Sequence, residues 1–222
     1  MANKILVVSQ RYWPENTRIT ALCEGFVKRG LKVDVLCGQP NYPLGQFFKG
    51  YRSFGNKVEK HNGVRLYRTC EVRRDSGSAF RILLNYITFP LAGRFKIPAL
   101  KASRYNAVLV YQRSPVFMDT VGLKIGKLLG IPVTTYAVDI WPQHFYQELD
   151  IQNSLLKKLF AKIDRDHYLA ADRIIVQCRK AADHFIQTLH MHSGKVTCIP
   201  PAADDHQGNE SRDISVMERY AG

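Results

Sequence analysis

Three loops in this sequence carry side chains that could bind a polar or charged ligand, and each loop follows a short apolar run. The first loop contributes a set of charged and aromatic residues: Arg11, Trp13, Glu15 and Arg18. The second opens with Gln112 and Ser114, and the third with Asp139 and Trp141. If the apolar runs are strands of an open α/β sheet, ligands bind beyond their carboxyl ends, so these loops should meet at one site.

Arg18 lies in the first turn of the helix that the pattern predicts after the first loop. A cation there opposes the helix dipole by roughly 0.3–1 kcal/mol. Two interpretations stay open. Either the side chain is solvated and tolerates this cost, or Arg18 or Arg11 faces a phosphate or carboxylate beside the free N–H groups of the helix. The Gly-x-Gly-x-x-Gly fingerprint is absent from the sequence, which counts against an ordinary NAD-binding protein.

Asp139 follows a predicted strand, where a carboxylate could orient a sugar hydroxyl or act in proton transfer. Trp141 could stack on a sugar face or fill the core. Ser114 could contact a ligand, but it also suits the cap of a helix that has Pro115 at its first position. The residue types therefore favour Asp139 as the catalytic candidate and leave Ser114 and Trp141 open.

Short runs rich in β-branched residues predict the strands that position these loops. The runs span 4–9, 32–37, 107–111, 132–138, 173–177 and 195–199. Residues 58–68 predict an antiparallel strand pair, because Asn62-Gly63 is a strong hairpin signal. Strands and helical segments alternate along the chain. The sequence therefore predicts an α/β fold with a doubly wound, Rossmann-like parallel sheet over residues 1–201.

Apolar residues at helical spacing predict the helices of this domain. The first helix presents one apolar face, made of Ile19, Leu22, Cys23, Phe26 and Val27. Asn16 is its candidate cap and Gly30 its stop. We expect a helical segment over 78–104 that breaks at Pro90 and Pro98. Further helices are predicted over 114–130, around 155–163 and over 180–189, and the polar, acidic residues 202–212 indicate a linker or tail.

The chain has 222 residues, five cysteines and a formal net charge of +13. The cysteines are scattered and lack C-x-x-C spacing, so we expect neither disulfides nor a zinc site, and a reducing cytoplasm fits best. The sequence contains no apolar run long enough to cross a membrane and no signal-peptide pattern. The positive charge favours an anionic partner, which could be nucleic acid, lipid headgroups or a phosphorylated substrate.

Basic residues gather between Arg73 and Arg113, where eight Arg or Lys residues accompany a single acid, Asp75. Aromatic and aliphatic side chains lie among them: Phe80, Ile82, Leu83, Leu84, Tyr86, Ile87, Phe89 and Phe95. This composition is typical of an interfacial element that docks on anionic lipid. The alternative is a core helix whose basic side chains reach outward to water. Nucleic acid is disfavoured, because no helix-turn-helix, zinc or RNA-binding signature is present.

Five motifs, in this order, resemble the bacterial family 4 glycosyltransferases: KILVVSQRYWPEN, EGFVKRGLKVDVLCGQPNYPLG, GYR, YNAVLVYQRSP and VDIWP. The likeness covers Asn3 to Pro201 and is greatest to enzymes that build O-antigen, capsule and colanic-acid repeat units. It implies one half of a GT-B type enzyme, in which two Rossmann-like domains face a cleft. The N-terminal domain of such enzymes binds the acceptor, often a lipid-linked saccharide at the inner membrane. The C-terminal domain binds the nucleotide-sugar donor.

The resemblance also implies a role for each loop. The loop over 10–18 would line the cleft beside the donor phosphates, Asn41 and Tyr42 would lie near the acceptor, and Asp139 would face the reacting sugar. Transfer in the family usually retains the anomeric configuration and needs no metal or other cofactor. A glycine pair that many members carry after the first strand is not present here, which weakens the expected phosphate contact.

The resemblance implies that the donor-binding domain lies outside these 222 residues. Residues 202–222 would then be a linker and the opening strand of that domain, since Tyr-Ala-Gly often precedes its glycine-rich loop. We therefore expect a chain that is inactive alone and serves surface polysaccharide synthesis at the cytoplasmic face of the bacterial plasma membrane. A non-enzymatic assembly module is the alternative. A nucleotide-sugar epimerase or dehydrogenase is disfavoured, because no Tyr-x-x-x-Lys pair is present.

Overall fold

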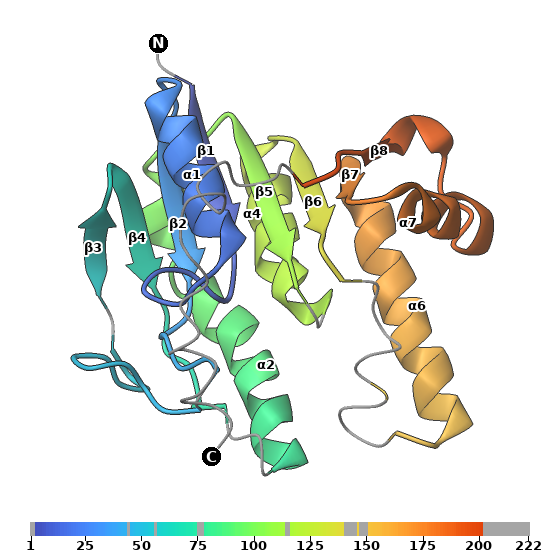
Figure 1. Cartoon of the computed structure of the whole chain (residues 1–222), viewed down its shortest axis with the longest axis horizontal. Helices are drawn as coiled ribbons and strands as arrows, with labels where there is room; N and C mark the ends of the chain where they lie inside the picture. The colour runs from blue at the N-terminus through green and yellow to red at the C-terminus, as the bar shows by residue number, and fades with distance from the viewer. Residues whose placement is uncertain are drawn as a thin grey trace, which may run out of the picture.

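The computed structural model describes residues 3–43, 45–55, 57–74, 78–113, 116–139, 146 and 151–201. These residues form an eight-stranded sheet in the order β3-β4-β2-β1-β5-β6-β7-β8 (Figure 1). The strands are β1 (Lys4–Val8), β2 (Lys32–Cys37), β3 (Val58–His61), β4 (Val64–Arg68), β5 (Ala107–Gln112), β6 (Val133–Ala137), β7 (Arg173–Val176) and β8 (Val196–Cys198). All neighbours pair in parallel except β3, which is antiparallel to β4. The predicted doubly wound sheet is confirmed.

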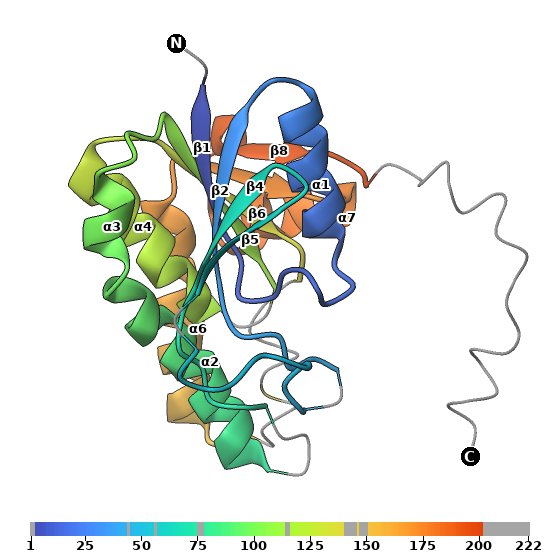
Figure 2. The ribbon, with the colours of Figure 1, turned by 90° about the vertical axis from the view of Figure 1, so that its left-hand side faces the viewer.

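The helices cover both faces of the sheet (Figure 2). They are α1 (Arg18–Lys28), α2 (Ala79–Arg94), α3 (Ile97–Lys101), α4 (Asp119–Leu129), α6 (Ser154–Ala170) and α7 (Arg179–Asp183). α2, α3, α4 and α6 lie on one face, and α1 lies on the other (Figure 2). The chain passes from β1 to β2 on one side and later returns to place β5 on the other side of β1. The boundary between β1 and β5 is therefore the point where the strand order reverses, which is where open α/β sheets bind ligands.

Each layer of helices buries its own apolar core against the sheet. Leu6 and Val8 of β1 join the core on the α2 side, together with Phe89. Val7 points the other way and packs in the α1-side core with Ile19. All five side chains are fully buried. Burial on both faces explains why this central parallel strand is a continuous apolar run in the sequence.

One predicted helix break is wrong. α2 runs through Pro90, although a proline inside a helix costs about 3 kcal/mol. Pro90 is buried, and so are Tyr86 and Phe89 in the same turns. Packing against the sheet therefore holds the helix together across the missing hydrogen bond. The second predicted break is confirmed, because a separate helix, α3, contains Pro98 in its first turn.

Three other helix boundaries differ from the sequence pattern. α1 begins at Arg18 with Thr17, not Asn16, as its cap residue, and the Thr17 side chain makes no capping hydrogen bond. α4 begins only after a 3-10 turn (Val116–Met118). The segment predicted as one helix over 180–189 is α7 followed by a π-helical turn (His184–Thr188).

α6 confirms the predicted helix but exposes part of its apolar face. Phe160 and Ile163 pack into a small core with residues of α2. Leu155, Leu156 and Leu159, in contrast, keep 72%, 43% and 51% of their surface exposed. Within the described ranges, none of the helices combines the length and the apolar character that a membrane span requires.

Candidate functional site

β1, β5 and β6 are neighbours in the sheet, and their carboxyl ends lie together at the lower side of Figure 1. Tyr111 of β5 and Tyr136 of β6 lie there edge to face, with ring centroids 5.4 Å apart. Burial raises the pKa of Tyr111, while the charges of Arg113 and Arg18 lower it and that of Asp139 raises it. These five residues therefore lie close together where the strand order reverses, and we call them the switch-point group.

The switch-point group suits an anionic ligand that also carries hydroxyls. Neither Arg18 nor Arg113 forms an ion pair with any residue in the described ranges. Two cations beside a helix N-terminus favour a phosphate. A neighbouring carboxylate such as Asp139 can accept a hydroxyl hydrogen bond or a proton. The structure brings Arg18 and Asp139 around one tyrosine pair, and their roles toward a ligand stay predictions.

Glu15 and Asn41 connect the loops around this site. Oε1 of Glu15 accepts the backbone N–H groups of Asn41 at 2.7 Å and Tyr42 at 2.8 Å. Burial raises the pKa of Glu15, and these two hydrogen bonds lower it. The buried Asn41 donates to the Gln39 carbonyl at 2.8 Å and accepts from the Arg74 backbone N–H at 3.0 Å. Both side chains thus hold the loop after β2 in place, and their predicted substrate contact stays a prediction.

Arg11 and Tyr42 lie against each other, although the sequence places them in different loops. The guanidinium carbon of Arg11 is 3.6 Å from the centre of the Tyr42 ring. A cation over an aromatic face is attracted by the ring, so the contact fixes both side chains. The loop after β1 and the loop after β2 therefore present one combined surface.

Trp13 and Gln112, two predicted substrate-binding residues, contact other residues of the protein in the structure. The Trp13 ring stacks on His61 at 4.0 Å between centroids, and its carbonyl accepts a hydrogen bond from the buried Arg68. The Gln112 side chain is fully buried, and its oxygen accepts from the Tyr168 hydroxyl at 2.7 Å. Two further predicted site residues lie outside the described residues: Ser114 and Trp141.

Sequence reasoning missed a buried cluster of Gln10, Glu71 and Asn85, which we call the Glu71 cluster. Oε1 of Glu71 accepts from Gln10 Nε2 at 2.7 Å and from Asn85 Nδ2 at 2.6 Å. Its Oε2 has no hydrogen-bond partner among the described residues, and a Cβ on Gly38 would lie 1.6 Å from it. Burial raises the pKa of Glu71 to about 8, and the Gln10 hydrogen bond opposes this. The cluster ties the loops after β1 and β4 to α2.

A second missed group lies between α4, β6 and α6. Burial raises the pKa of Asp119 well above its ordinary range, and the charge of Asp164 adds to this. Burial likewise raises the pKa of Asp164 to about 8. Carboxyls in such surroundings keep their protons near neutral pH, which fits a structural role. In the part of the chain that the structure describes, no three His, Cys, Asp or Glu side chains gather as a possible metal site. The expectation of metal-free transfer stays a prediction.

Comparison with known sequences gives one match. Residues 16–207 match the family model Glyco_transf_4, which describes Glycosyltransferase Family 4. This range covers most of the chain, including the switch-point group and two residues of the Glu71 cluster, Glu71 and Asn85. No curated protein is significantly similar to the chain in sequence.

Comparison with solved structures gives matches to GT-B glycosyltransferases. LpCGTa in complex with UDP matches with a TM-score of 0.59 and 13% identity, over 98% of this chain and 57% of its own. Alr3699/HepE of Anabaena, in complex with UDP-glucose, gives 0.55 and 15%, over 98% and 49%. UGT89C1 of Arabidopsis thaliana, complexed with UDP, gives 0.53 and 12%, over 99% and 54%. At these identities the likeness shows the fold, and this chain spans about half the length of each.

Proposed function

Since the chain belongs to Glycosyltransferase Family 4, we propose that it supplies the acceptor-side domain of a two-domain GT-B glycosyltransferase. In this proposal residues 1–201 form the domain, and 202–222 lead into a second domain that binds the nucleotide sugar. The observation that supports the proposal best is the switch-point group. At the ligand-binding edge of the sheet it combines a carboxylate with two cations that form no ion pair with any described residue. Transfer requires both domains, so this domain is inactive alone.

In the proposed reaction, a sugar passes from a nucleoside diphosphate to an acceptor hydroxyl. Arg18 and Arg113 face the donor diphosphate, where they stabilise the negative charge that develops on the leaving group. Asp139 binds a hydroxyl of the reacting sugar or takes up the acceptor proton. The structures solved with UDP and with UDP-glucose support a nucleotide-sugar donor for this fold.

The finer assignment follows the sequence resemblance. We propose that transfer retains the anomeric configuration and uses no metal, because the arginines supply the charge that a divalent cation would otherwise provide. The transferred group is a hexose or an N-acetylamino sugar. The acceptor is a lipid-linked saccharide of bacterial surface polysaccharide synthesis, such as lipopolysaccharide or capsule.

The outer face of α2 supports docking at a membrane surface. Phe80, Ile87 and Leu91 lie along this helix at helical spacing and keep 68%, 36% and 47% of their surface exposed. No acidic residue occurs within α2, and Arg81 is exposed beside Phe80. Apolar side chains flanked by cations are the combination that binds the interface of an anionic bilayer.

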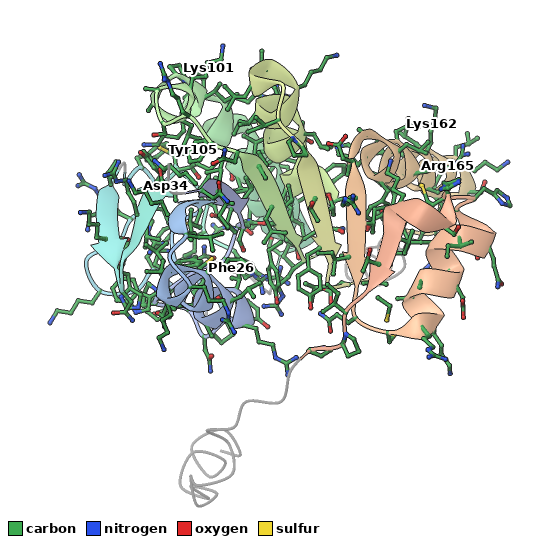
Figure 3. The ribbon with its side chains drawn as sticks, turned by 90° about the horizontal axis from the view of Figure 1, so that it is seen from above. Phe26, Asp34, Lys101, Tyr105, Lys162 and Arg165 are labelled. Carbon is green, nitrogen blue, oxygen red and sulfur yellow. The ribbon has the colours of Figure 1, made fainter. Side chains whose placement is uncertain are left out.

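Basic side chains extend this surface along the same face of the molecule. Figure 3 shows Lys101 of α3 and Lys162 and Arg165 of α6 projecting on the side opposite to Phe26 of α1. α2 and α6 also both extend past the strand tips at the carboxyl edge of the sheet (Figures 1 and 2). We therefore propose that the protein binds the inner face of the bacterial plasma membrane with the ligand-binding edge close to the lipid.

The role of Asp139 is tested in the chain joined to its donor domain. Asp139→Asn keeps the shape of the side chain but removes its charge, so we expect turnover to fall by about 100-fold or more while the protein still folds. Asp183→Asn, on the exposed surface of α7, is the matched control. Turnover of Asp139→Asn equal to that of the control would remove Asp139 from the site.

A non-enzymatic assembly module remains the second candidate, because a single Rossmann-like domain can bind a partner without transferring a sugar. The two candidates differ in what the DNA downstream encodes. A donor domain with two glutamates spaced eight apart supports the enzyme, and unrelated sequence supports the module. Sugar transfer by the 222-residue chain alone would contradict the need for a second domain.

A further inference from the structure

Gln112 is the last residue of β5, and it connects α6 with the switch-point group. Its side-chain oxygen accepts a hydrogen bond from the Tyr168 hydroxyl of α6 at 2.7 Å. Its backbone carbonyl accepts from the N–H of Val138 at 2.9 Å. Arg113 follows Gln112 directly in the chain, and Asp139 follows Val138. Gln112 therefore lies next to a cation of the switch-point group and is bonded to the residue that precedes its carboxylate.

Tyr168 makes this hydrogen bond from a fixed position inside the protein. Its side chain is fully buried, and its ring packs edge to face against Phe185 with the centroids 4.6 Å apart. Burial raises the pKa of Tyr168 well above its ordinary value, and the charge of Asp139 adds to this rise. The hydroxyl therefore keeps its proton and remains a donor to Gln112. The effect of Asp139 also means that Tyr168 lies near the switch-point group.

A buried carboxyl on α6 supports the orientation of the Tyr168 hydroxyl. Asp164 lies one helical turn before Tyr168 and is also fully buried. Burial raises the pKa of Asp164 to about 8, and a hydrogen bond with Tyr168 opposes this rise. A phenol has a single proton to donate, and Tyr168 donates it to Gln112. At neutral pH the carboxyl holds its own proton, so Asp164 can donate to the Tyr168 oxygen and leave the phenol proton directed at Gln112.

The Gln112 amide depends on this one hydrogen bond. Its Nε2 has no hydrogen-bond partner among the described residues, although the side chain is fully buried. Without the Tyr168 hydroxyl, both ends of a buried amide would be unsatisfied, which is costly. The amide can reduce that cost only by moving toward water. Because the backbone of Gln112 is bonded to Val138, such a movement also shifts the ends of β5 and β6, where the switch-point residues lie.

We propose that Tyr168 and Gln112 are positioning residues for sugar transfer. The Tyr168 hydroxyl holds Gln112 in place, and Gln112 in turn sets where Arg113 and Asp139 lie relative to each other. The inference rests on the proposed function, which assigns the donor diphosphate to Arg113 and the reacting sugar or the acceptor proton to Asp139. It goes beyond that function by giving a role to α6, a helix that supplies no residue to the switch-point group. Gln112 then serves the reaction without contacting the substrate.

The first experiment measures turnover of the chain joined to its donor domain, with Tyr168→Phe as the test variant. Phenylalanine keeps the ring that packs on Phe185 and removes only the hydroxyl. Tyr105→Phe is the matched control, because Tyr105 is also buried and its hydroxyl donates a 2.7 Å hydrogen bond to Asp34 (Figure 3). Tyr105 precedes β5, so it lies at the opposite edge of the sheet from the switch-point group. Each variant loses one buried hydrogen bond, but only Tyr168→Phe loses it beside the site.

We expect Tyr168→Phe to lower kcat by about 10- to 100-fold, the effect of a catalytic group that is slightly misplaced. The KM for the nucleotide sugar should change by less than about threefold, because uniform binding by the donor domain is retained. Tyr105→Phe should keep kcat within about threefold of the wild type, since its hydrogen bond is far from the reacting atoms. Both variants should lower the midpoint of urea unfolding to a similar extent, so a difference in kcat reports position rather than stability.

A double-mutant cycle tests whether Tyr168 acts through Gln112. Gln112→Leu removes the acceptor of the hydrogen bond and leaves a buried apolar side chain, with circular dichroism as the check of folding. In the Gln112→Leu background, Tyr168→Phe should lower kcat by less than about threefold, because the hydrogen bond is already absent. An equal loss of kcat in both backgrounds would mean that Tyr168 acts independently of Gln112 and would overturn the proposal.

A second experiment needs no turnover and uses the 222-residue chain, whose backbone amides are followed by 1H–15N NMR. Tyr168→Phe should shift the signals of Arg113, Val138 and Asp139, and Tyr105→Phe should leave them in place. Unchanged signals in Tyr168→Phe overturn the proposal, and so does a kcat equal to that of Tyr105→Phe. If the wild-type joined chain transfers no sugar, the proposed function fails, and the NMR comparison still decides whether Tyr168 positions the site.

Discussion

Replacing Glu71 by glutamine should make the protein more stable at alkaline pH. The carboxyl is fully buried, and burial raises its pKa from 4.5 to about 8. Between these two pH values the folded state holds a proton that the unfolded state releases. The stability of the wild-type protein therefore falls as pH rises through this window, and no such effect exists below pH 4.5, where both states are protonated.

The size of the effect follows from the two pKa values. A tenfold change in an equilibrium constant is worth about 1.4 kcal/mol, so the full change from 4.5 to about 8 is worth up to about 5 kcal/mol. From about pH 5.5 to about pH 8.5, the wild-type protein loses about 3 kcal/mol of unfolding free energy through this group. Glutamine keeps the oxygen that accepts from Gln10 and Asn85, and it carries no charge at any of these pH values. Over this pH range, the free energy of unfolding of Glu71→Gln should therefore fall by about 3 kcal/mol less than that of the wild type.

Urea unfolding at the two pH values, followed by circular dichroism, measures this difference. Glu24→Gln is the matched control, because Glu24 is a half-exposed carboxylate on α1 that also accepts a side-chain hydrogen bond. The control should keep the pH dependence of the wild type. If Glu71→Gln also keeps it, then Glu71 is ionised in the folded protein and a counter-charge has been overlooked.

Two further predictions concern the Glu71 cluster and the surface of α2. Gly38→Ala would place a Cβ 1.6 Å from Glu71 Oε2, so we expect a loss of about 1–3 kcal/mol in urea unfolding. This loss of unfolding free energy should be smaller when Gly38→Ala is made in a Glu71→Ala background, and an unchanged loss there would contradict the clash. Gly25→Ala, where the new Cβ meets only ordinary contacts, should cause no such loss. The chain should float with vesicles that contain anionic lipid, less so at high salt, and Phe80→Ser with Leu91→Ser should reduce flotation. Val58→Ser is the control, because Val58 on β3 is an apolar residue of similar exposure, and it should leave flotation unchanged. Failure of the wild-type chain to float at low salt would refute membrane docking.

The strands could be predicted from the sequence because their patterns depend on short stretches of chain. A continuous apolar run such as 4–9 has to be buried on both faces, and Asn62-Gly63 requires backbone angles that a hairpin turn provides; both residues have positive φ in the structure. The break expected at Pro90 is absent, because contacts with the sheet outweigh the local cost of the proline. Local patterns carry no information about such contacts.

The candidate site was predictable in its location but not in the partners of its side chains. The rule that ligands bind at strand ends correctly placed Arg18 and Asp139 at one edge. The same rule did not find Glu71, because residues 58–68 predict only a hairpin. The structure adds that β4 also pairs in parallel with β2, which brings the carboxyl end of β4 to the site edge. Residue type alone could not show that Oε1 of Glu15 accepts hydrogen bonds from the backbone N–H groups of Asn41 and Tyr42.

The outer strands of the sheet have a consequence for solubility. β3 forms one edge, and two of its four residues, Glu59 and Lys60, are charged. β8 forms the other edge and is only three residues long. Short or charged edge strands offer a poor template for a foreign strand, so they discourage aggregation through sheet extension. The domain can therefore be joined to other domains, or concentrated at a surface, without its sheet pairing with that of a neighbour.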